Sequence, residues 1–496
     1  MGIKSFLAKQ IANWRVKQIR KTVADPRKAQ EQTLRKLLDK AKDTAFGRDH
    51  DFGNIQTLKD FQERVPVNDY EGIRPYIDRA YAGEKDVLWP GQPAYFAKTS
   101  GTTSGAKYIP LTDDSMKNQV KGARDALLFY INETGNASFI NGKMIFLTGA
   151  PTLEKNEAGL NVGRLSGISM HYVPNYLQRN RVPSWETNCI EDWEKKIEKI
   201  VEETKDVDLR VISGIPPWVQ MYVERLQEVT SKSVQQIWPN LQLFVQGGVD
   251  YRPYEDMFRK YLGDVDVVEV YPASEGFIGV QSSLKDNGLM LMLDYDIFYE
   301  FIPLEEYGKE NARRLPLWEV EKDTDYAIVL STNAGLWAYD IGDTVRFTSL
   351  EPYKLRVSGR VKHFISAFGE HVIQQEVNSA MVEACDATRA EVTEFTVAPF
   401  VSEHVSYHEW FVEFETPPSD LKHFSELIDQ AMQRQNSYYA DLREGNMLRP
   451  AVVHMVERDA CREYMKSIGK LGGQNKYPRL GNDRKVASFM EKYVIA

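Results

Sequence analysis

Four short apolar runs, each closed by a glycine or proline turn, constrain the fold of this chain more than any other feature. Apolar runs of about four to eight residues without polar alternation are typical of strands buried on both faces. Helical patterns alternate with these runs, at 113–132, 191–206, 216–230 and 251–262. The alternation predicts an α/β fold of sheets flanked by helices. The runs are KMIFLTGAP (143–151), LRVISGIPP (209–217), LQLFVQGG (241–248) and DVVEVYPAS (266–274).

The pattern changes at about residue 288, where long strands of alternating polarity replace the buried runs. Segments such as LMLMLDYDIFYEFIPL and LWAYDIGDTVRFTSL carry few helix signals, which predicts an antiparallel sheet or a β-barrel-like part. Helix-like and strand-like pieces of a smaller α+β domain follow the basic stretch near residue 360. We therefore expect a large N-terminal domain over 1–360 and a smaller, mobile C-terminal domain over 361–496.

Several general features indicate where the chain works. No apolar run approaches the ~20 residues that cross a bilayer, so we expect no integral membrane association. The N-terminus is too charged for a secretory signal. Cys189, Cys385 and Cys461 lie far apart, which indicates neither a disulfide framework nor a zinc site. These features predict a cytoplasmic protein, and we expect it to be a monomer.

Positive charge is concentrated at the N-terminus. Residues 1–48 hold 13 Lys and Arg against 4 Asp and Glu, or +9, which leaves −18 for the remainder of a chain whose net charge is −9. Such asymmetry invites a membrane or nucleic-acid function. However, Ile3, Leu7, Ile11 and Trp14 recur at helical spacing, which favours an amphipathic helix docked on the acidic body. No aromatic and basic platform is recognisable, so we expect no nucleic-acid partner.

The stretch AKTSGTTSGAKYIPLT (97–112) gathers hydroxyl residues, two glycines and a lysine in one short loop. Hydroxyl groups and the backbone N–H groups that glycines expose make a concave donor surface for oxyanions, and a lysine adds a positive charge. The Walker A spacing is absent, because Gly101 and Gly105 are one residue too close and Tyr108 follows Lys107. The loop predicts phosphate binding outside the usual NTPase fold, although a polar turn between strands is the alternative.

Three later stretches carry further polar groups. YPASEG (271–276) closes a predicted buried strand with a hydroxyl beside a carboxylate, where α/β sheets place ligands. YDIGDTVRF (339–347) offers Asp343, an acceptor able to take two hydroxyl donors such as a ribose diol. SGRVKHFISAFGEHV (358–372) supplies Arg360 and Lys362 at the expected domain boundary. Each stretch on its own is more often structural than functional.

In this order and spacing, the motifs resemble those of the adenylate-forming superfamily of acyl-activating enzymes. TSGTTSGAK is similar to the phosphate loop of that superfamily, and LFVQGGVD to its adenine-side glycine pair. VYPASEG is similar to its aromatic-x-x-(Thr/Ser)-Glu motif, and GRVKHFISAFGEHV to its hinge motif. The resemblance covers most of the chain.

Within the superfamily, the chain most resembles the auxin-responsive Gretchen Hagen family of acyl acid amido synthetases. The resemblance rests on FGRDHDFGNIQTLKDFQERVPVNDYEGIRPYIDRAYAGE, on YPASEGFIG and on QNKYPRL (474–480), which is similar to the late lysine motif of that family. The run SAFGEHV departs from the one that plant members carry after the hinge. We therefore expect a microbial relative.

The resemblance implies that the motifs bind ATP and Mg²⁺. Glu275 would hold Mg²⁺, and Lys476, from the smaller domain, would approach the α-phosphate in the transition state; these two are the expected catalytic residues. Asp343 would fix the ribose hydroxyls, Ser274 the α-phosphate, and Arg360 the ribose or a phosphate. The remaining nucleotide-binding residues would be Ser100, Thr102, Thr103, Ser104 and Lys107 on the phosphates, Gly247 and Gly248 on the adenine side, and Tyr271.

The same resemblance implies a reaction in two steps. A carboxylic acid is activated with ATP to an acyl-adenylate and pyrophosphate, and the acyl group then passes to an amine, usually an amino acid. Lys476 lies more than a hundred residues after the boundary, so we expect the small domain to close about a hinge at Gly359 to Lys362. An acyl-CoA or other thioester ligase would share the first step. A nucleotide-binding scaffold without chemistry is a third alternative, against which Glu275 and the late lysine argue.

Overall fold

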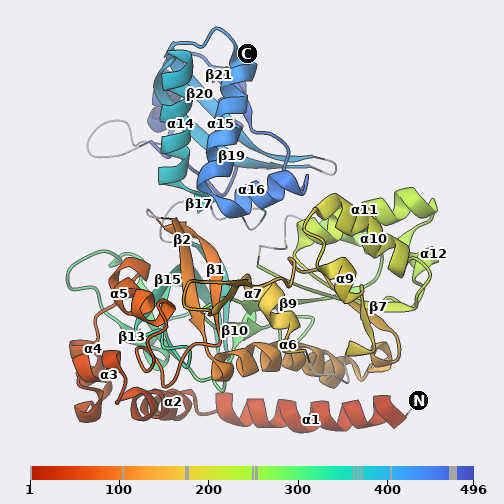
Figure 1. Ribbon diagram of the computed structural model, residues 1–496, viewed down its shortest axis with the longest axis vertical. Helices are drawn as coiled ribbons and strands as arrows, with labels where there is room; N and C mark the ends of the chain where they lie inside the picture. The colour runs from red at the N-terminus through yellow and green to blue at the C-terminus, as the bar shows by residue number, and fades with distance from the viewer. Residues whose placement is uncertain are drawn as a thin grey trace. The chain divides into compact units, whose positions relative to one another are not determined.

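The computed structural model divides the chain into two compact units (Figure 1). The first unit comprises residues 1–99, 107–191 and 195–361, and the second comprises 100–106, 192–194 and 362–496. The structure describes residues 3–102, 105–173, 178–248, 251, 255–286, 288–360, 364, 365, 368, 370, 372–402, 405–468 and 477–495.

A twelve-stranded sheet forms the centre of the first unit, in the order β13-β12-β14-β15-β16-β11-β10-β9-β8-β7-β3-β6. The five strands from β9 to β6 all run parallel. Four of them are the apolar runs of the sequence, so the predicted α/β sheet with buried strands is confirmed. The parallel strands are β3 (Lys143–Phe146), β6 (Arg181–Val182), β7 (Leu209–Ser213), β8 (Leu243–Gly247) and β9 (Asp266–Pro272).

The other strands of this sheet are antiparallel, as the alternating pattern predicts. They continue the parallel half at the β9–β10 pair instead of standing apart from it. Their inner faces form the largest apolar core of the unit, which includes Phe298, Val329 and Phe347. The strands are β10 (Phe277–Val280), β11 (Leu289–Leu291), β12 (Ile297–Pro303), β13 (Leu315–Pro316), β14 (Asp325–Thr332), β15 (Tyr339–Leu350) and β16 (Tyr353–Arg360).

Helices cover the sheet, and among the described residues none of them combines the length and apolar character needed to cross a bilayer. The longest, α6 (Asp113–Thr134), begins with a capping box between Thr112 and Ser115 and ends at Gly135 in the left-handed conformation, with φ 64°. The others are α1 (Ile3–Val23), α2 (Pro26–Ala41), α3 (Ala45–Asp49), α4 (Leu58–Arg64), α5 (Tyr70–Tyr81), α7 (Leu165–Met170), α9 (Trp185–Asn188), α10 (Trp193–Thr204), α11 (Pro216–Thr230), α12 (Val234–Ile237) and α13 (Glu255–Leu262).

Helix α6 lies very close to the sheet where its parallel and antiparallel halves meet. A Cβ atom at Gly122 would lie 2.3 Å from Cγ of Phe277, the first residue of β10. Only glycine therefore allows this approach. Gln119, one turn earlier on α6, donates from Nε2 to the backbone oxygen of Ala273 at 2.7 Å. The helix is thus fixed directly on the turn that follows β9.

A smaller four-stranded sheet, in the order β2-β1-β5-β4, carries the polar loop between its first two strands. Strand β1 runs parallel to β5, with Tyr95 opposite Asn161. The strands are β1 (Tyr95–Thr102), β2 (Gly105–Leu111), β4 (Glu154–Lys155) and β5 (Asn161–Gly163).

Helix α1 packs on the first unit, as expected, but the face that the sequence analysis favoured for packing is wrong. Leu7, Ile11 and Trp14 are exposed by more than half of their surface, at 53%, 53% and 63%. The opposite face makes the contact: Ala12, Val16 and Ile19 are buried in a core that α6 completes. The helix is apolar on both faces, so helical spacing alone could not tell which face docks.

The second unit is built on a three-stranded sheet, β19-β20-β21. Strands β19 (Glu391–Val401) and β20 (Ser406–Thr416) are antiparallel, and β21 (Val452–Val456) is parallel to β20. Two apolar cores include alternate residues of β20, such as Trp410 in one and Phe411 in the other, so helices cover both faces. The helices are α14 (Gln374–Thr388), α15 (Leu421–Gln435), α16 (Ser437–Glu444), α17 (Ala460–Ser467) and α18 (Lys485–Met490), and β17 (Phe364–Ile365) pairs with β18 (Val372–Ile373).

The contact between α6 and β10 predicts that Gly122→Ala destabilises the protein. Overpacking against Phe277 costs about 1–3 kcal/mol, which exceeds the roughly 0.8–1 kcal/mol that alanine contributes to a helix over glycine. Urea unfolding followed by circular dichroism measures the difference. Gly53→Ala is the matched control, because a Cβ atom there meets nothing within 4 Å. Equal stability of the two variants would contradict the close approach.

Candidate active site

The parallel strands β8 and β9 end at the same edge of the sheet, and both expected adenine-side motifs lie there. Gly247, the last residue of β8, is opposite Val270 of β9. A Cβ atom at Gly247 would lie 2.3 Å from the backbone oxygen of Val270, and Gly248 has a φ of 88°. Both positions therefore require glycine, which leaves this edge without side chains that would cover it. Carboxyl edges of such sheets are where α/β proteins bind ligands.

A tight turn between β9 and β10 presents the expected hydroxyl and carboxylate. Ala273 and Gly276 exchange two backbone hydrogen bonds, N to O, at 2.9 and 3.1 Å. Ser274 and Glu275 form the tip of this turn, and both side chains are partly exposed. The bond from Gln119 to Ala273 holds the turn against α6. Glu275 is therefore a carboxylate on a rigid support, at the junction of the two halves of the sheet.

A bulge in β15 sets the position of Asp343. Asp340 pairs with Val329 and Thr344 with Ala327, so three residues of β15 face one residue of β14. Gly342, inside the bulge, has a φ of 81°, which favours glycine. Asp343 is 7% exposed and lies opposite Arg360 of β16. The two expected ribose-binding residues are thus cross-strand neighbours in the backbone.

The hydroxyl group of Tyr271 donates a hydrogen bond to Oδ2 of Asp343. Their strands, β9 and β15, are four steps apart in the sheet order. In a flat sheet these strands would lie about 19 Å apart, at ~4.8 Å per step, which is beyond the reach of a tyrosine and an aspartate. The sheet therefore curls strongly here, which supports the expected barrel-like character and unites two motifs that are 72 residues apart.

Two further tyrosines, which sequence reasoning missed, lie near expected site residues: Tyr70 near Lys107, and Tyr339 within electrostatic range of Glu275. The ammonium group of Lys107 lies 5.7 Å from the ring centroid of Tyr70, and the Tyr70 hydroxyl accepts from the backbone N–H of Tyr108 at 3.0 Å. Tyr339 is fully buried, and burial together with the negative charge of Glu275 raises its pKa well above the ordinary value. Its hydroxyl group therefore stays neutral. Tyr70 lies in a stretch that carries the family resemblance, and Tyr339 begins the stretch YDIGDTVRF, in which the sequence analysis singled out only Asp343.

Two buried polar groups beside these motifs lack hydrogen-bond partners in the part of the chain that the structure describes. They are the hydroxyl group of Tyr339 and both amide atoms of Gln246, which is 1% exposed and precedes Gly247. Buried polar atoms are nearly always satisfied, so unsatisfied ones are expected where a ligand or water completes the site.

The structure thus brings six of the predicted residues to one region of the first unit: Gly247, Gly248, Tyr271, Ser274, Glu275 and Asp343. Lys107 lies over the ring of Tyr70, and Arg360 pairs with Asp343 through the backbone. Ser100 and Thr102 lie on β1, with side chains that are not described. Thr103, Ser104 and Lys476 lie outside the described residues. Within the described part of the chain, no three His, Cys, Asp or Glu side chains gather as a ready-made metal site.

The pairing of Tyr271 with Asp343 predicts different stabilities for two tyrosine variants. Tyr271→Phe removes a hydrogen bond to a buried carboxylate and should lower the free energy of unfolding by about 1–3 kcal/mol. Tyr339→Phe is the matched control: it removes a buried hydroxyl that has no hydrogen-bond partner among the described residues, so its effect should stay below about 0.5 kcal/mol. Thermal and urea unfolding measure both, and the reverse order would contradict the described geometry.

Comparisons with known proteins agree with the motifs. The GH3 family N-terminal domain matches residues 15–188, the central domain 290–360 and the C-terminal domain 375–485. Indole-3-acetic acid-amido synthetase GH3.10 of Arabidopsis thaliana is 23% identical, with 91% of each chain covered. Jasmonoyl-L-amino acid synthetase GH3.5 of Oryza sativa subsp. japonica is 22% identical, with 95% of each covered. No comparison tests the expected microbial origin, which stays a prediction.

Solved structures show the same fold. The GH3.15 acyl acid amido synthetase superposes with a TM-score of 0.62 at 17% identity, over 97% of this chain and 96% of that one. A 2-hydroxyisobutyryl-CoA ligase superposes with a TM-score of 0.60 at 14% identity, over 96% of this chain and 92% of that one. The three family domains together span most of the sequence, and the chain therefore belongs to the GH3 family.

Proposed function

We propose that this chain is an acyl acid amido synthetase, which activates a carboxylic acid with ATP and joins it to an amino acid. The observation that carries the proposal is the convergence of Glu275, Tyr271 and Asp343 at the carboxyl edge of β8 and β9. Family membership and the names of the curated relatives, which are amido synthetases, support the same reaction.

The glycine pair and Asp343 suit the nucleoside of ATP. A flat purine needs an edge free of side chains, and Gly247 and Gly248 leave the end of β8 open. Asp343 is buried and held by Tyr271, so its carboxylate is oriented before a ribose diol arrives. Arg360, opposite Asp343, would complete the ribose or phosphate contacts.

The turn and the polar loop suit the phosphates. Ser274 would donate to the α-phosphate, and Lys107 would balance charge on the β- and γ-phosphates. Mg²⁺ is commonly held by one or two carboxylates together with substrate phosphates, and the single partly exposed carboxylate of Glu275 fits that requirement. The bound ion would neutralise phosphate charge. The hydroxyl groups of Ser100, Thr102, Thr103 and Ser104 would add hydrogen bonds to the same oxygens.

The reaction places a specific demand on these groups, because a carboxylate must approach the negatively charged ATP. A carboxylate oxygen attacks the α-phosphorus, and the bond to the pyrophosphate oxygen breaks. A neutral amine then attacks the acyl carbon, AMP leaves with the bonding electron pair, and the nitrogen loses a proton. Fixed cations and donors at the α-phosphate lower the first barrier, since they are oriented before charge builds up.

Lys476 and the C-terminal domain, residues 361–496, complete the proposal. Lys476 would stabilise charge on the α-phosphate during adenylation. Rotation about Gly359 to Lys362 would bring it to the nucleotide and later remove it for acyl transfer. Free cysteines at positions 189, 385 and 461 suit the expected reducing cytoplasm, and we expect a monomer. Thioester formation with CoA is the second candidate, favoured by the likeness of fold to a CoA ligase.

Glu275→Gln should lower acid-dependent exchange of pyrophosphate into ATP by about a hundredfold or more, because the carboxylate that holds Mg²⁺ is lost. The acid panel takes its members from the names of the relatives: indole-3-acetic acid, jasmonic acid and 4-substituted benzoates. Glu186→Gln, on the exposed surface of α9, is the control and should exchange as the wild type does. AMP release should then depend on amino acids. If AMP release depended only on CoA, the proposed product would be a thioester instead of an amide.

Lys476→Ala should separate the two half-reactions. Acid-dependent exchange should fall by about a hundredfold, since a cation at the α-phosphate is lost. Conversion of a synthetic acyl-adenylate to the amide should persist, because the proposed domain rotation removes Lys476 from the α-phosphate before the amine attacks. Lys470→Ala, in the same segment, is the matched control. Equal loss of both half-reactions would contradict the role given to Lys476.

A further inference from the structure

The outer face of α1 carries large apolar side chains that stay more than half exposed. The exposed fractions of Phe6, Leu7, Ile11 and Trp14 all exceed half, at 55%, 53%, 53% and 63%. Among the described residues, no other helix carries more than one large exposed apolar side chain. Single exposed apolar residues are ordinary, but a group of four on successive turns marks an interaction surface. Here these four residues are called the outer stripe.

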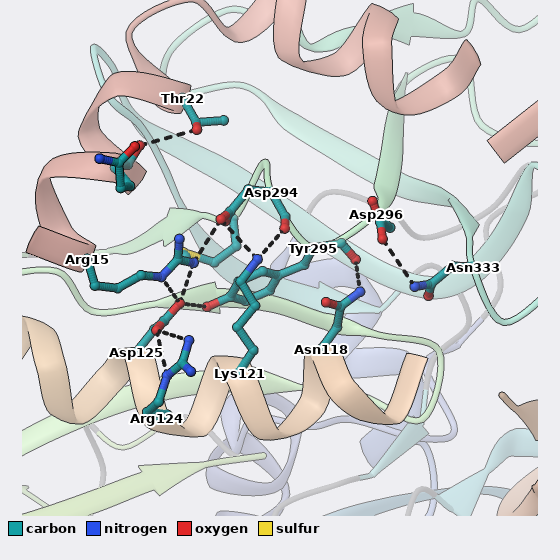
Figure 2. Close-up of polar contacts among 12 residues, drawn as sticks. Arg15, Thr22, Asn118, Lys121, Arg124, Asp125, Asp294, Tyr295, Asp296 and Asn333 are labelled. Atoms are coloured by element: carbon teal, nitrogen blue, oxygen red, sulfur yellow. Dashed lines mark hydrogen bonds and ion pairs between the residues drawn. The ribbon is translucent and has the colours of Figure 1, made fainter. Parts of the chain in front are cut away.

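The inner face of α1 holds the helix firmly, so the outer stripe cannot turn inward. Arg15 contacts the carboxylate of Asp125 at 2.5 Å and that of Asp294 at 2.8 Å (Figure 2). The carboxyl group of Asp125 is completely buried, and Tyr295 also donates to it at 2.9 Å. Breaking such a buried pair is strongly unfavourable. The outer stripe is therefore displayed on a helix that is fixed to α6.

Exposed basic side chains lie on both sides of the outer stripe along the helix. Helix α1 contains six basic residues and no acidic residue. Arg15 points inward, whereas Lys4, Lys17, Arg20 and Lys21 are exposed. Lys17 follows Trp14 by three positions and Lys21 follows Lys17 by four, so all three share one side of the helix. The outer surface thus combines aromatic and aliphatic groups in its first turns with cations in its last turns.

We infer that the outer stripe docks on an anionic phospholipid surface, with the helix axis lying in the plane of the membrane. Aromatic and aliphatic side chains beside lysines, on a helix without acidic groups, suit the boundary between acyl chains and anionic headgroups. Residues 4–21 of α1 span about 27 Å at ~1.5 Å per residue. The helix lies along one edge of the first unit (Figure 1). A second copy of the chain fits less well, because α1 carries no acidic residue that could pair with the cations of a second α1.

Such binding is peripheral and reversible. Four apolar side chains and four exposed cations give a modest membrane affinity, which falls as salt screens the cations. The inference does not depend on the proposed reaction, because binding is measurable without ATP or an acid.

Cosedimentation of the full-length protein with vesicles tests the inference. Wild-type protein should bind phosphatidylcholine vesicles that contain phosphatidylserine, should not bind pure phosphatidylcholine, and should be released by salt. Lys17→Gln with Lys21→Gln should weaken binding by about 30-fold. Leu7→Ser with Trp14→Ser should weaken it by at least about tenfold, through lost apolar burial. All four residues are exposed, so folding should be preserved, as circular dichroism checks.

Matched controls change the same residue types elsewhere. Lys232→Gln with Lys285→Gln removes two exposed lysines, and Val229→Ser with Val382→Ser removes two exposed apolar side chains. Both should bind as the wild type does. Failure of the wild type to bind at low salt would overturn the inference, as would equal losses in the controls. If the wild type dimerised without binding vesicles, and Leu7→Ser with Trp14→Ser abolished the dimer, the outer stripe would instead be an interface with a second copy of the chain.

Discussion

The hydrogen bond from Tyr271 to the buried carboxylate of Asp343 is the contact on which the geometry of the first unit depends. It forms only because the sheet curls between β9 and β15, and it lies beside the junction of parallel and antiparallel strands. The parallel strands contribute an open carboxyl edge at the end of β8, and the antiparallel strands contribute the carboxylate of Asp343, which a bulge positions. The site therefore needs both halves of the sheet.

The two units suit different tasks in a reaction with two steps. The groups proposed to hold ATP, such as Asp343 and Glu275, lie on a strand and on a turn fixed to α6, where they need no reorganisation. A cation needed only while charge builds up on the α-phosphate is better carried by a separate unit, since it can be withdrawn before the amine attacks. Lys476 lies outside the described residues, and the role proposed for it follows this division.

Much of the fold follows from local pattern. Short runs rich in Val, Ile and Leu predicted β3, β7, β8 and β9, because strands buried on both faces leave no polar alternation. Site residues carried by contiguous motifs, such as Ser274 and Glu275, could be named for the same reason. Tyr339 and Gln119 could not, since their roles come from neighbours more than sixty residues away in the sequence.

Helix α1 shows why a periodic pattern can mislead. Its larger apolar residues face outward, whereas small Ala12 and the charged Arg15 face the core. Arg15 is buried because it forms ion pairs with Asp125 and Asp294. Neither partner can be identified from the sequence of the helix. The large apolar residues therefore indicated the wrong face for packing. The correct face packs partly through ion pairs of Arg15, whose partners lie 110 and 279 residues away in the sequence.

The shortness of the turn at Ser274 and Glu275 restricts how such an enzyme can acquire new substrates. Pro272 pairs with Phe277, so an inserted residue would either break that pair or push the carboxylate outward by about 3.4 Å. Under the role proposed for Glu275, a library that seeks new acid preferences should therefore keep this turn at constant length and vary other segments.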